Sequence, residues 1–375
     1  MIISLKSAAY AALASFVACG LILATRRWHG RFTLDGHHGV QKIHTNPTPR
    51  IGGLGLIVGM CTGWAVQEES QVLINADQLL GFTLLASVPA FVMGFLEDIT
   101  KNISVRARLL ATMASGAIGY WLTGYGITRL DVPGVDTLLA LVPICLLFTA
   151  FAVAGVANAY NIIDGFNGLT SAAMIVAVAA IGSIAYEVGD TELVYFSLIY
   201  IAAILGFMAW NYPLGRIFLG DGGAYAMGFL IAWMAVMLPA RHPQVSPWAS
   251  LLACGYPVME TIYSMIRRKL HHKKSGEPDA EHLHSLIKRV IIRPRFQRFR
   301  TVIRNAMVTV TLLPFVASIA MTGVAFYRDT GLLMMAFAGY FALYVLSHRS
   351  LFHSRFAHEA GRPGAASQER VSDQR

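Results

Sequence analysis

Long apolar runs, each separated from the next by a short polar segment, recur along almost the whole of this 375-residue sequence. About 20 apolar residues are enough for a helix to cross the hydrocarbon core of a bilayer. The runs lack the alternation of apolar and polar residues that a barrel strand needs, so helices are the predicted element. Only 14% of the residues are charged and 55% are hydrophobic, whereas soluble domains carry about 25% charged residues. We therefore predict an all-α polytopic membrane protein and not a soluble protein with a large core.

The apolar runs predict about eleven transmembrane helices in one catalytic membrane domain, residues 1–347. The predicted spans are 2–25, 51–67, 79–96, 107–124, 136–156, 169–186, 193–209, 223–239, 248–266, 304–326 and 331–347. The first run is followed by several arginines and has no clear cleavage site, so it is interpreted as a retained span and not as a signal peptide. Residues 348–375 form a predicted cytoplasmic tail, whose polar segment after His358 is expected to be disordered.

Lysine and arginine are concentrated in one set of the predicted loops, which are 26–50, 97–106, 157–168, 210–222 and 267–303. The opposite set contains only Arg129, Arg241 and Arg328. The positive-inside rule puts the basic loops in the cytoplasm, with the N-terminus periplasmic and the C-terminus cytoplasmic. The net charge of +9 then reflects orientation and attraction to anionic headgroups, and no nucleic-acid-binding module is recognisable. Because the Asp, Asn, His and Gly clusters lie in the same loops, we expect an active site at the cytoplasmic face.

An acidic pair and a single aspartate border these loops. Glu97 and Asp98 end the third predicted span, where adjacent carboxylates need solvent, a partner or a metal. They suit a metal site or a general base, although a hydrated helix end would also explain them. Asp221 precedes two glycines at the start of the eighth span. There, backbone N–H groups could hold a phosphate while the carboxylate holds a cation, and a simple helix cap is the alternative.

A polar stripe follows the fifth span. Asn158, Asn161 and Asp164 have the i, i+3, i+6 spacing that places side chains along one face of a helix. Gly165 and Gly168 then allow the backbone to turn and to approach a ligand closely. A polar seam that only packs helices together is the alternative interpretation.

Two histidines and an arginine are the remaining candidate site residues. His282 and His284 do not share a helix face, so extended or loop structure is expected, with phosphate contact or acid–base work as their function. Two exposed histidines without function are the alternative. Pro294 is expected to interrupt any helix in the basic segment 287–300, which could lie along the headgroups. Arg50 could pair with a phosphate or with the carboxylates, and a plain turn into the membrane would also place it there.

The cluster as a whole indicates phosphoryl chemistry. Hard carboxylate oxygens favour Mg²⁺, with Mn²⁺ as a substitute, over zinc, and metal, glycine-rich turns and cations together suit phosphoryl transfer. The four cysteines show no paired spacing and are interpreted as buried small hydrophobic residues, neither disulfides nor metal ligands.

Five ordered motifs give the sequence a specific resemblance. They are Pro-Thr-Pro-Arg-Ile-Gly-Gly (47–53), Gly-Phe-Leu-Glu-Asp (94–98), Asn-Ala-Tyr-Asn-Ile-Ile-Asp-Gly-Phe-Asn-Gly-Leu (158–169), Phe-Leu-Gly-Asp-Gly-Gly (218–223) and Glu-His-Leu-His (281–284). From about residue 40 to 347 the chain resembles the polyprenyl-phosphate N-acetylhexosamine-1-phosphate transferases (MraY/WecA-like, glycosyltransferase family 4). The form of the histidine motif resembles the branch that initiates O-antigen and other surface glycans.

This resemblance implies magnesium-dependent transfer of a sugar 1-phosphate from a UDP-N-acetylhexosamine to undecaprenyl phosphate, with release of UMP, in the bacterial inner membrane. It implies that Asp221 binds the metal. The implied catalytic residues are Glu97, Asp98, Asn161, Asp164, His282 and His284. The implied substrate-binding residues, together with Arg50 and Asn158, are Gly165, Asn167 and Phe218, the last by stacking on uracil.

Two departures from the family pattern affect these roles. Glu97 replaces the first of two usual aspartates, which leaves the division of labour between Glu97 and Asp98 open. Asn167 replaces an aspartate, so it is not assigned acid–base work. A phospho-N-acetylmuramoyl-pentapeptide transferase is the alternative within the class, and a polytopic transporter is the alternative outside it. The identity of the sugar and the oligomeric state are left open, with a homodimer as one option.

Overall fold

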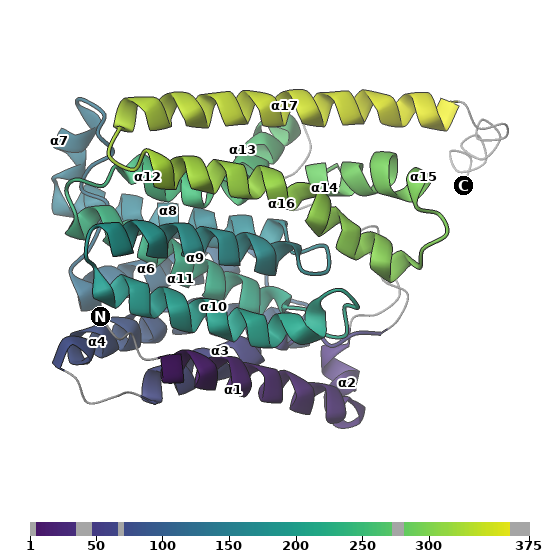
Figure 1. The fold of residues 1–375 in the computed structure, drawn as a ribbon, viewed down its shortest axis with the longest axis horizontal. Coiled ribbons are helices and arrows are strands. Elements are labelled where there is room, and N and C mark those ends of the chain that lie inside the picture. The colour runs from purple at the N-terminus through teal and green to yellow at the C-terminus, as the bar shows by residue number, and fades with distance from the viewer. Residues whose placement is uncertain (1–4, 35–46, 67–70, 272–280, 361–375) are drawn as a thin grey trace.

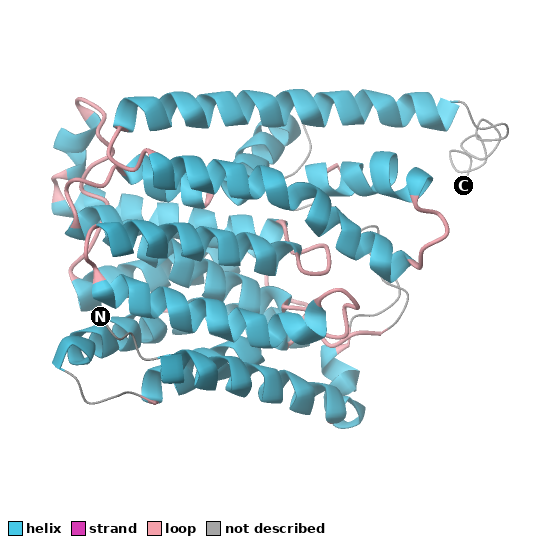
Figure 2. Ribbon diagram, viewed as in Figure 1, coloured by secondary structure: helices cyan, strands magenta, loops and turns pink. Residues whose placement is uncertain are grey.

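The secondary structure is helical throughout the described part of the chain. The computed structural model describes residues 5–34, 47–66, 71–271 and 281–360, and gives the backbone only for 71–77 and 355–360. Within these ranges the one pairing of extended backbone is an isolated bridge between Leu34 and Pro49, and Figure 2 shows helices joined by loops. The prediction of an all-α chain is confirmed here.

Seven of the described helices are long and apolar enough to cross a membrane. They are α1 (Leu5–Ala24), α8 (Val142–Ile162), α9 (Leu169–Glu187), α10 (Thr191–Asn211), α11 (Gly220–Arg241), α16 (Thr301–Ala325) and α17 (Thr330–Ala360). An eighth candidate is the pair α4 (Gln71–Ala86) and α5 (Val88–Thr100), which is bent by 42°. A polytopic membrane protein is therefore confirmed, while eleven spans and their orientation stay predictions.

The remaining helices are shorter or more polar. They are α2 (Arg26–Thr33), α3 (Gly52–Ala65), α6 (Val105–Thr123), α7 (Val135–Leu139), α12 (Pro247–Ala253), α13 (Gly255–Leu270), α14 (Leu283–Leu286), a π-helix (Ile287–Ile292) and α15 (Arg293–Arg295). Helical structure continues through Pro294, so the expected interruption there is wrong. The π-helix ends two residues before Pro294, and the helical stretch ends one residue after it, at Arg295.

Four predicted boundaries need correction. The span 136–156 is broken between α7, which ends at Leu139, and α8, which runs from Val142 to Ile162. The span 79–96 is broken near Ser87, just before Pro89, and the span 248–266 is broken at Cys254, just before Pro257. In both places proline removes a backbone donor that a continuous helix would use. The tail predicted from residue 348 is helical as far as Ala360, and residues 361–375 lie outside the described part, as do 35–46 and 272–280 of the predicted loops.

Most of the long helices lie side by side in one bundle, and their connections gather at its two ends (Figure 1). One end holds α2, the turn 163–168, the loop 212–219 and the α14–α15 segment, while the opposite end holds α7. Helix α11 is almost completely buried and packs against α3, α5 and α8, whereas much of α17 is exposed. Large apolar side chains such as Leu147 and Met335 face outward, as expected where lipid is the solvent.

Glycine contacts bring three helices together where the site forms. A Cβ atom on Gly53 of α3 would lie 2.2 Å from Cα of Gly223 in α11, and one on Gly94 of α5 would lie 2.6 Å from the carbonyl oxygen of Asp221. Small residues allow such close backbone approach in membrane bundles. The first turn of α11 is thereby fixed between α3 and α5.

Candidate active site

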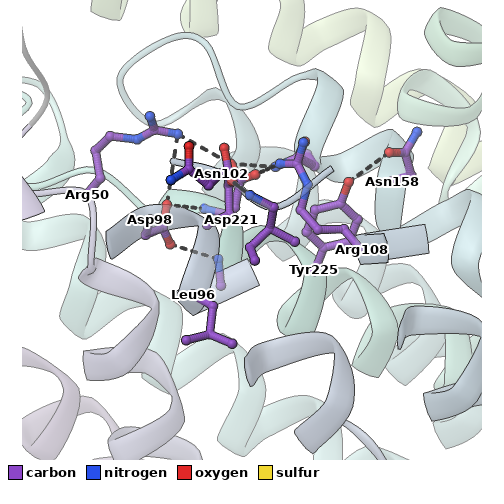
Figure 3. A network of polar contacts seen from close by, with 12 residues as sticks. Arg50, Leu96, Asp98, Asn102, Arg108, Asn158, Asp221 and Tyr225 are labelled. Atoms are coloured by element: carbon purple, nitrogen blue, oxygen red, sulfur yellow. Dashed lines mark hydrogen bonds and ion pairs between the residues drawn. The ribbon is translucent and has the colours of Figure 1, made fainter. Parts of the chain in front are cut away.

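Asp221 is the centre of a polar cluster at the first turn of α11. Its carboxylate forms an ion pair with Arg108 of α6 and accepts hydrogen bonds from Arg50 Nη2 at 3.3 Å and Asn161 Nδ2 at 3.2 Å. Arg50 and Arg108 approach it from opposite sides (Figure 3). Asp221 is only 7% exposed, and these partners satisfy its charge. Side chains from three other elements therefore converge on one carboxylate.

Asp98 supports this centre from the last turn of α5. It is 1% exposed, and its two carboxylate oxygens accept the backbone N–H groups of Asp221 at 2.8 Å and Gly222 at 2.9 Å. A negative group at a helix N-terminus is stabilised by the free N–H groups and by the helix dipole. Asp98 therefore caps α11 from a neighbouring helix. The expectation that these N–H groups hold a phosphate is wrong in this structure, because Asp98 occupies both.

Glu97 has a different environment from its neighbour. Its Oε2 accepts the backbone N–H of Ile103 at 2.6 Å, and the side chain is half-buried. This bond closes the turn between α5 and α6, the helix that carries Arg108. The two adjacent acids therefore separate, with Asp98 directed to α11 and Glu97 directed to the following turn.

The loop that carries Arg50 is tied to the start of α11. The N–H of Phe218 donates to the carbonyl of Pro49 at 2.8 Å, and the N–H groups of Gly52 and Gly53 donate to the carbonyls of Phe218 and Leu219 at 2.9 and 2.8 Å. These bonds place Arg50 beside Asp221. The Phe218 side chain is half-buried, and uracil stacking on it stays a prediction.

Arg108 and Tyr225 belong to the cluster although they were not among the predicted site residues. The Arg108 guanidinium carbon lies 5.7 Å from the centre of the Tyr225 ring, and the Tyr225 hydroxyl donates to Asn158 Oδ1 at 3.0 Å. Asn158 and Asn161 thus face the same cluster, as their spacing predicts. An arginine inside the apolar run 107–124 was the signal that could have revealed Arg108.

Asp164 lies beyond the end of α8, so the predicted stripe leaves the helix after Ile162. Burial raises the pKa of the Asp164 carboxyl to about 6, against the opposing effect of the nearby Arg50 guanidinium. The adjoining turn approaches the histidine segment, because a Cβ on Gly165 would lie 3.8 Å from His284 Nε2 and Phe166 packs edge-on against the His284 ring. The acid and histidine motifs therefore come together.

Asn167 does not line the open site. It is 1% exposed, and its Nδ2 donates to the carbonyl of Pro213 at 2.9 Å. The backbone carbonyl of Asn167 accepts a hydrogen bond from the hydroxyl of Thr309 in α16 at 2.8 Å. The Asn167 amide thus holds the turn 163–168 to the neighbouring loop and to α16, and the predicted nucleotide contact stays a prediction.

His282 and His284 are both buried, at 8% and 2% exposure, so the alternative of two exposed histidines is wrong. His282 precedes α14 in extended backbone and His284 lies inside it, so the expected loop structure holds for His282 only. Both rings lie near Glu260 of α13, which was not among the predicted site residues. A lone carboxylate in the predicted span 248–266 was the signal for Glu260.

The donor chemistry at Asp221 fits a magnesium ion. No group of three His, Cys, Asp or Glu side chains able to hold a metal occurs among the described residues. Mg²⁺, however, is commonly held by one or two carboxylates, with waters and substrate phosphates as its other ligands. One hard carboxylate beside the Asn161 amide is therefore a suitable protein contribution to such a site.

The fold and the cluster are those of a polytopic membrane protein with acids, cations and histidines gathered at one end of a helical bundle. Residues 80–239 match the sequence model of glycosyl transferase family 4. This range contains Asp98, Asp164 and Asp221.

Curated relatives extend the similarity over more of the chain. A probable undecaprenyl-phosphate N-acetylglucosaminyl 1-phosphate transferase of Bacillus subtilis (strain 168) is 26% identical over 281 residues, covering 75% of this chain and 74% of the relative. The undecaprenyl-phosphate alpha-N-acetylglucosaminyl 1-phosphate transferase of Escherichia coli (strain K12) is 29% identical over 258 residues, or 66% and 67% of the two chains. That of Yersinia pestis is 28% identical over 298 residues, or 77% and 76%. These similarities agree with the resemblance found in the motifs of the chain.

Proposed function

We propose that this protein transfers N-acetylhexosamine 1-phosphate from a UDP-sugar to undecaprenyl phosphate and releases UMP. In this reaction a phosphate oxygen of the lipid attacks the phosphorus that carries the sugar. A new P–O–P link forms while the bond to the UMP phosphate breaks. N-Acetylglucosamine is the favoured sugar, because the relatives are named for it. The site would face the cytoplasm of a bacterial inner membrane, where UDP-sugars are made, and O-antigen or another surface glycan would receive the product.

The convergence of Arg50, Arg108 and Asn161 on Asp221 is the observation that carries this proposal. Two phosphate-bearing substrates bring several negative charges together, and guanidinium groups stabilise such charge by bidentate hydrogen bonds. Both arginines already lie at the carboxylate that would hold a metal. A diphosphate entering here would therefore meet cations on both sides of Asp221.

The individual roles follow from the contacts. Asp221, beside Asn161, would hold Mg²⁺ (or Mn²⁺), and when bound the ion would neutralise charge on the diphosphate. Arg50 and Arg108 would orient the phosphates. Asp98 would keep the first turn of α11 in place through its two backbone bonds, and His284 would lie beside the turn that approaches the substrate.

A donor screen tests the proposal. Purified protein in detergent, with undecaprenyl phosphate and Mg²⁺, is given UDP-N-acetylglucosamine, its galactosamine and fucosamine relatives, or the muramoyl-pentapeptide donor, and UMP is measured. We expect UMP from an N-acetylhexosamine donor. Release from the pentapeptide donor alone would assign the peptidoglycan reaction, and no release from any donor would refute the transferase function.

Metal dependence has its own test. EDTA should abolish UMP release, and added Mg²⁺ should restore it. Asp221→Asn should lower turnover by about 10²- to 10³-fold, the scale of losing one preorganised electrostatic group at a reacting centre, while the unfolding temperature is unchanged. Asp329→Asn is the matched control, because this exposed carboxylate caps α17 through Leu332 N–H. Full turnover by the Asp221 variant would remove this residue from the site.

A further inference from the structure

Glu260 is a fully buried carboxylate that lies among hydrogen-bond donors and has no role yet in the proposed reaction. Its Oε1 lies 2.9 Å from His282 Nδ1 and accepts the Ser264 hydroxyl at 3.4 Å. Its Oε2 accepts the backbone N–H of Leu283 at 3.2 Å and the Tyr256 hydroxyl at 3.5 Å. Donors on both oxygens stabilise the ionised form of a buried carboxylate. Glu260 thus supplies a negative charge behind the histidine segment.

The contacts of Glu260 specify which ring nitrogens carry protons. An ionised carboxylate only accepts hydrogen bonds, so Nδ1 of His282 must be the donor in its 2.9 Å contact. Tyr256 has one hydroxyl proton. If it gives this proton to Glu260 Oε2 at 3.5 Å, its oxygen can only accept from His284 Nδ1, which lies 3.2 Å away. Glu260 therefore acts on Nδ1 of His282 directly, and it can act on Nδ1 of His284 through Tyr256.

The two rings point the same way. Their planes are 17° apart with centres separated by 5.2 Å. Both Nδ1 atoms face Glu260, at 2.9 and 3.9 Å, so both Nε2 atoms face away from it. For His284 that direction leads to the turn after Asp164, because Nε2 would lie 3.8 Å from a Cβ on Gly165. Nε2 of His284, opposite Glu260, is therefore directed to the site, and the nearly parallel His282 ring lies beside it.

The segment that carries the histidines is held at its start as well. Glu281 forms an ion pair with Arg267 of α13, and its carbonyl lies 2.7 Å from Nε2 of His348 in α17. Tyr344 and His348 are the further titratable groups near Glu260 on α17. The backbone of 281–284 is thus fixed to two helices, which leaves side-chain protonation and ring rotation as the properties that Glu260 controls.

We propose that Glu260 is a positioning residue that keeps Nδ1 of His282 and His284 protonated, so that Nε2 of each ring is the atom that takes or gives a proton beside the bound diphosphate. Glu260 touches no substrate and acts through the two rings and Tyr256. The kinetic part of this inference rests on the proposed function, whereas the protonation pattern does not. A buried partner of this kind typically changes activity by about 10- to 100-fold.

Nitrogen-15 NMR of histidine-labelled protein in detergent tests the protonation pattern on the unmodified chain. Protonated and unprotonated ring nitrogens differ in chemical shift, and His282→Gln and His284→Gln variants assign the signals. We expect protonated Nδ1 on both rings at neutral pH. A His282 ring with unprotonated Nδ1 would overturn the proposal, whether or not the protein releases UMP.

Variants of Glu260 test the consequence. Gln can turn its NH₂ group toward Nδ1 and so no longer specifies the tautomer. Glu260→Gln should lower kcat by about 10- to 100-fold, with a smaller change in KM for the UDP-sugar, and should alter the ring signals. Glu260→Asp keeps the charge and should retain the wild-type tautomer and more activity than the Gln variant. If the Gln variant does not fold, the Asp variant and the wild-type spectrum decide.

The exposed Glu187 provides the matched control, because Glu187→Gln makes the same chemical change away from the histidines and should leave kcat and the spectrum unchanged. Wild-type kcat and tautomer in the Glu260→Gln variant would refute the positioning role. Absence of UMP release from wild-type protein with every donor would refute the proposed function instead, and would leave the NMR result standing.

Discussion

Replacing Asp98 by asparagine tests how the acidic motif works. The wild-type carboxylate accepts two backbone N–H groups of α11 at 2.8 and 2.9 Å in a site that is 1% exposed. Asparagine keeps one acceptor and turns an NH₂ group toward the other N–H. The variant therefore loses one hydrogen bond to a charged group, about 1.5–3 kcal/mol, and the attraction between a charge and a helix N-terminus, about 1–2 kcal/mol in a buried setting.

The sum is about 2.5–5 kcal/mol at the turn that holds Asp221. Since about 1.4 kcal/mol corresponds to tenfold, UMP release should fall by about 60- to 4,000-fold if the loss displaces Asp221. Unfolding temperature, followed by tryptophan fluorescence in detergent, should fall as well. Both measurements are made on one preparation, so that loss of folded protein is separated from loss of turnover.

Glu97→Gln is the internal control, because it changes the adjacent acid in the same way. In the wild type the Ile103 N–H donates to Glu97 Oε2 at 2.6 Å, and glutamine keeps an oxygen that can accept this bond. The side chain is half-buried. Its effect on stability should stay near about 1 kcal/mol. Equal losses in the two variants, or a harmless Asp98→Asn, would refute the cap and restore a shared role for the pair.

Three further predictions concern stability. Asn167→Asp should lower the free energy of unfolding by about 1–3 kcal/mol, because the donor to the Pro213 carbonyl is lost in a buried site; a variant as stable as wild type would contradict this. The pKa of Asp164 is raised to about 6, so the folded state loses stability as pH rises from about 4 to 6. Asp164→Asn should therefore raise the unfolding temperature at pH 7.5 while turnover falls, and a lower temperature would contradict the sign. Gly53→Ala should destabilise by about 1–3 kcal/mol through its clash with α11, whereas Gly155→Ala, with open space around it, should change stability by less than about 1 kcal/mol.

Local sequence was sufficient for the features that depend on composition and short spacing. Apolar runs predicted helices because lipid leaves the backbone no other way to satisfy its hydrogen bonds. The i, i+3 spacing of Asn158 and Asn161 predicted a shared face, and both side chains contact the central cluster. Broken spans were missed because apolar composition hides a break, and only the neighbouring prolines indicated it.

Tertiary structure decided which partner each acid has. Glu97 and Asp98 are adjacent and alike in the sequence, yet Asp98 meets residues 123 and 124 positions away while Glu97 bonds within its own turn. Asp98 reaches that turn because Gly94 lets α5 approach the α11 backbone closely. In the sequence Glu260 is a single acid within an apolar run, and only the fold places His282 and His284 beside it. Composition and local spacing predict a membrane bundle with acids at its loops. The packing of α3, α5, α11 and α13 sets the contacts of these acids, because hydrogen-bond partners of buried charges come from distant segments.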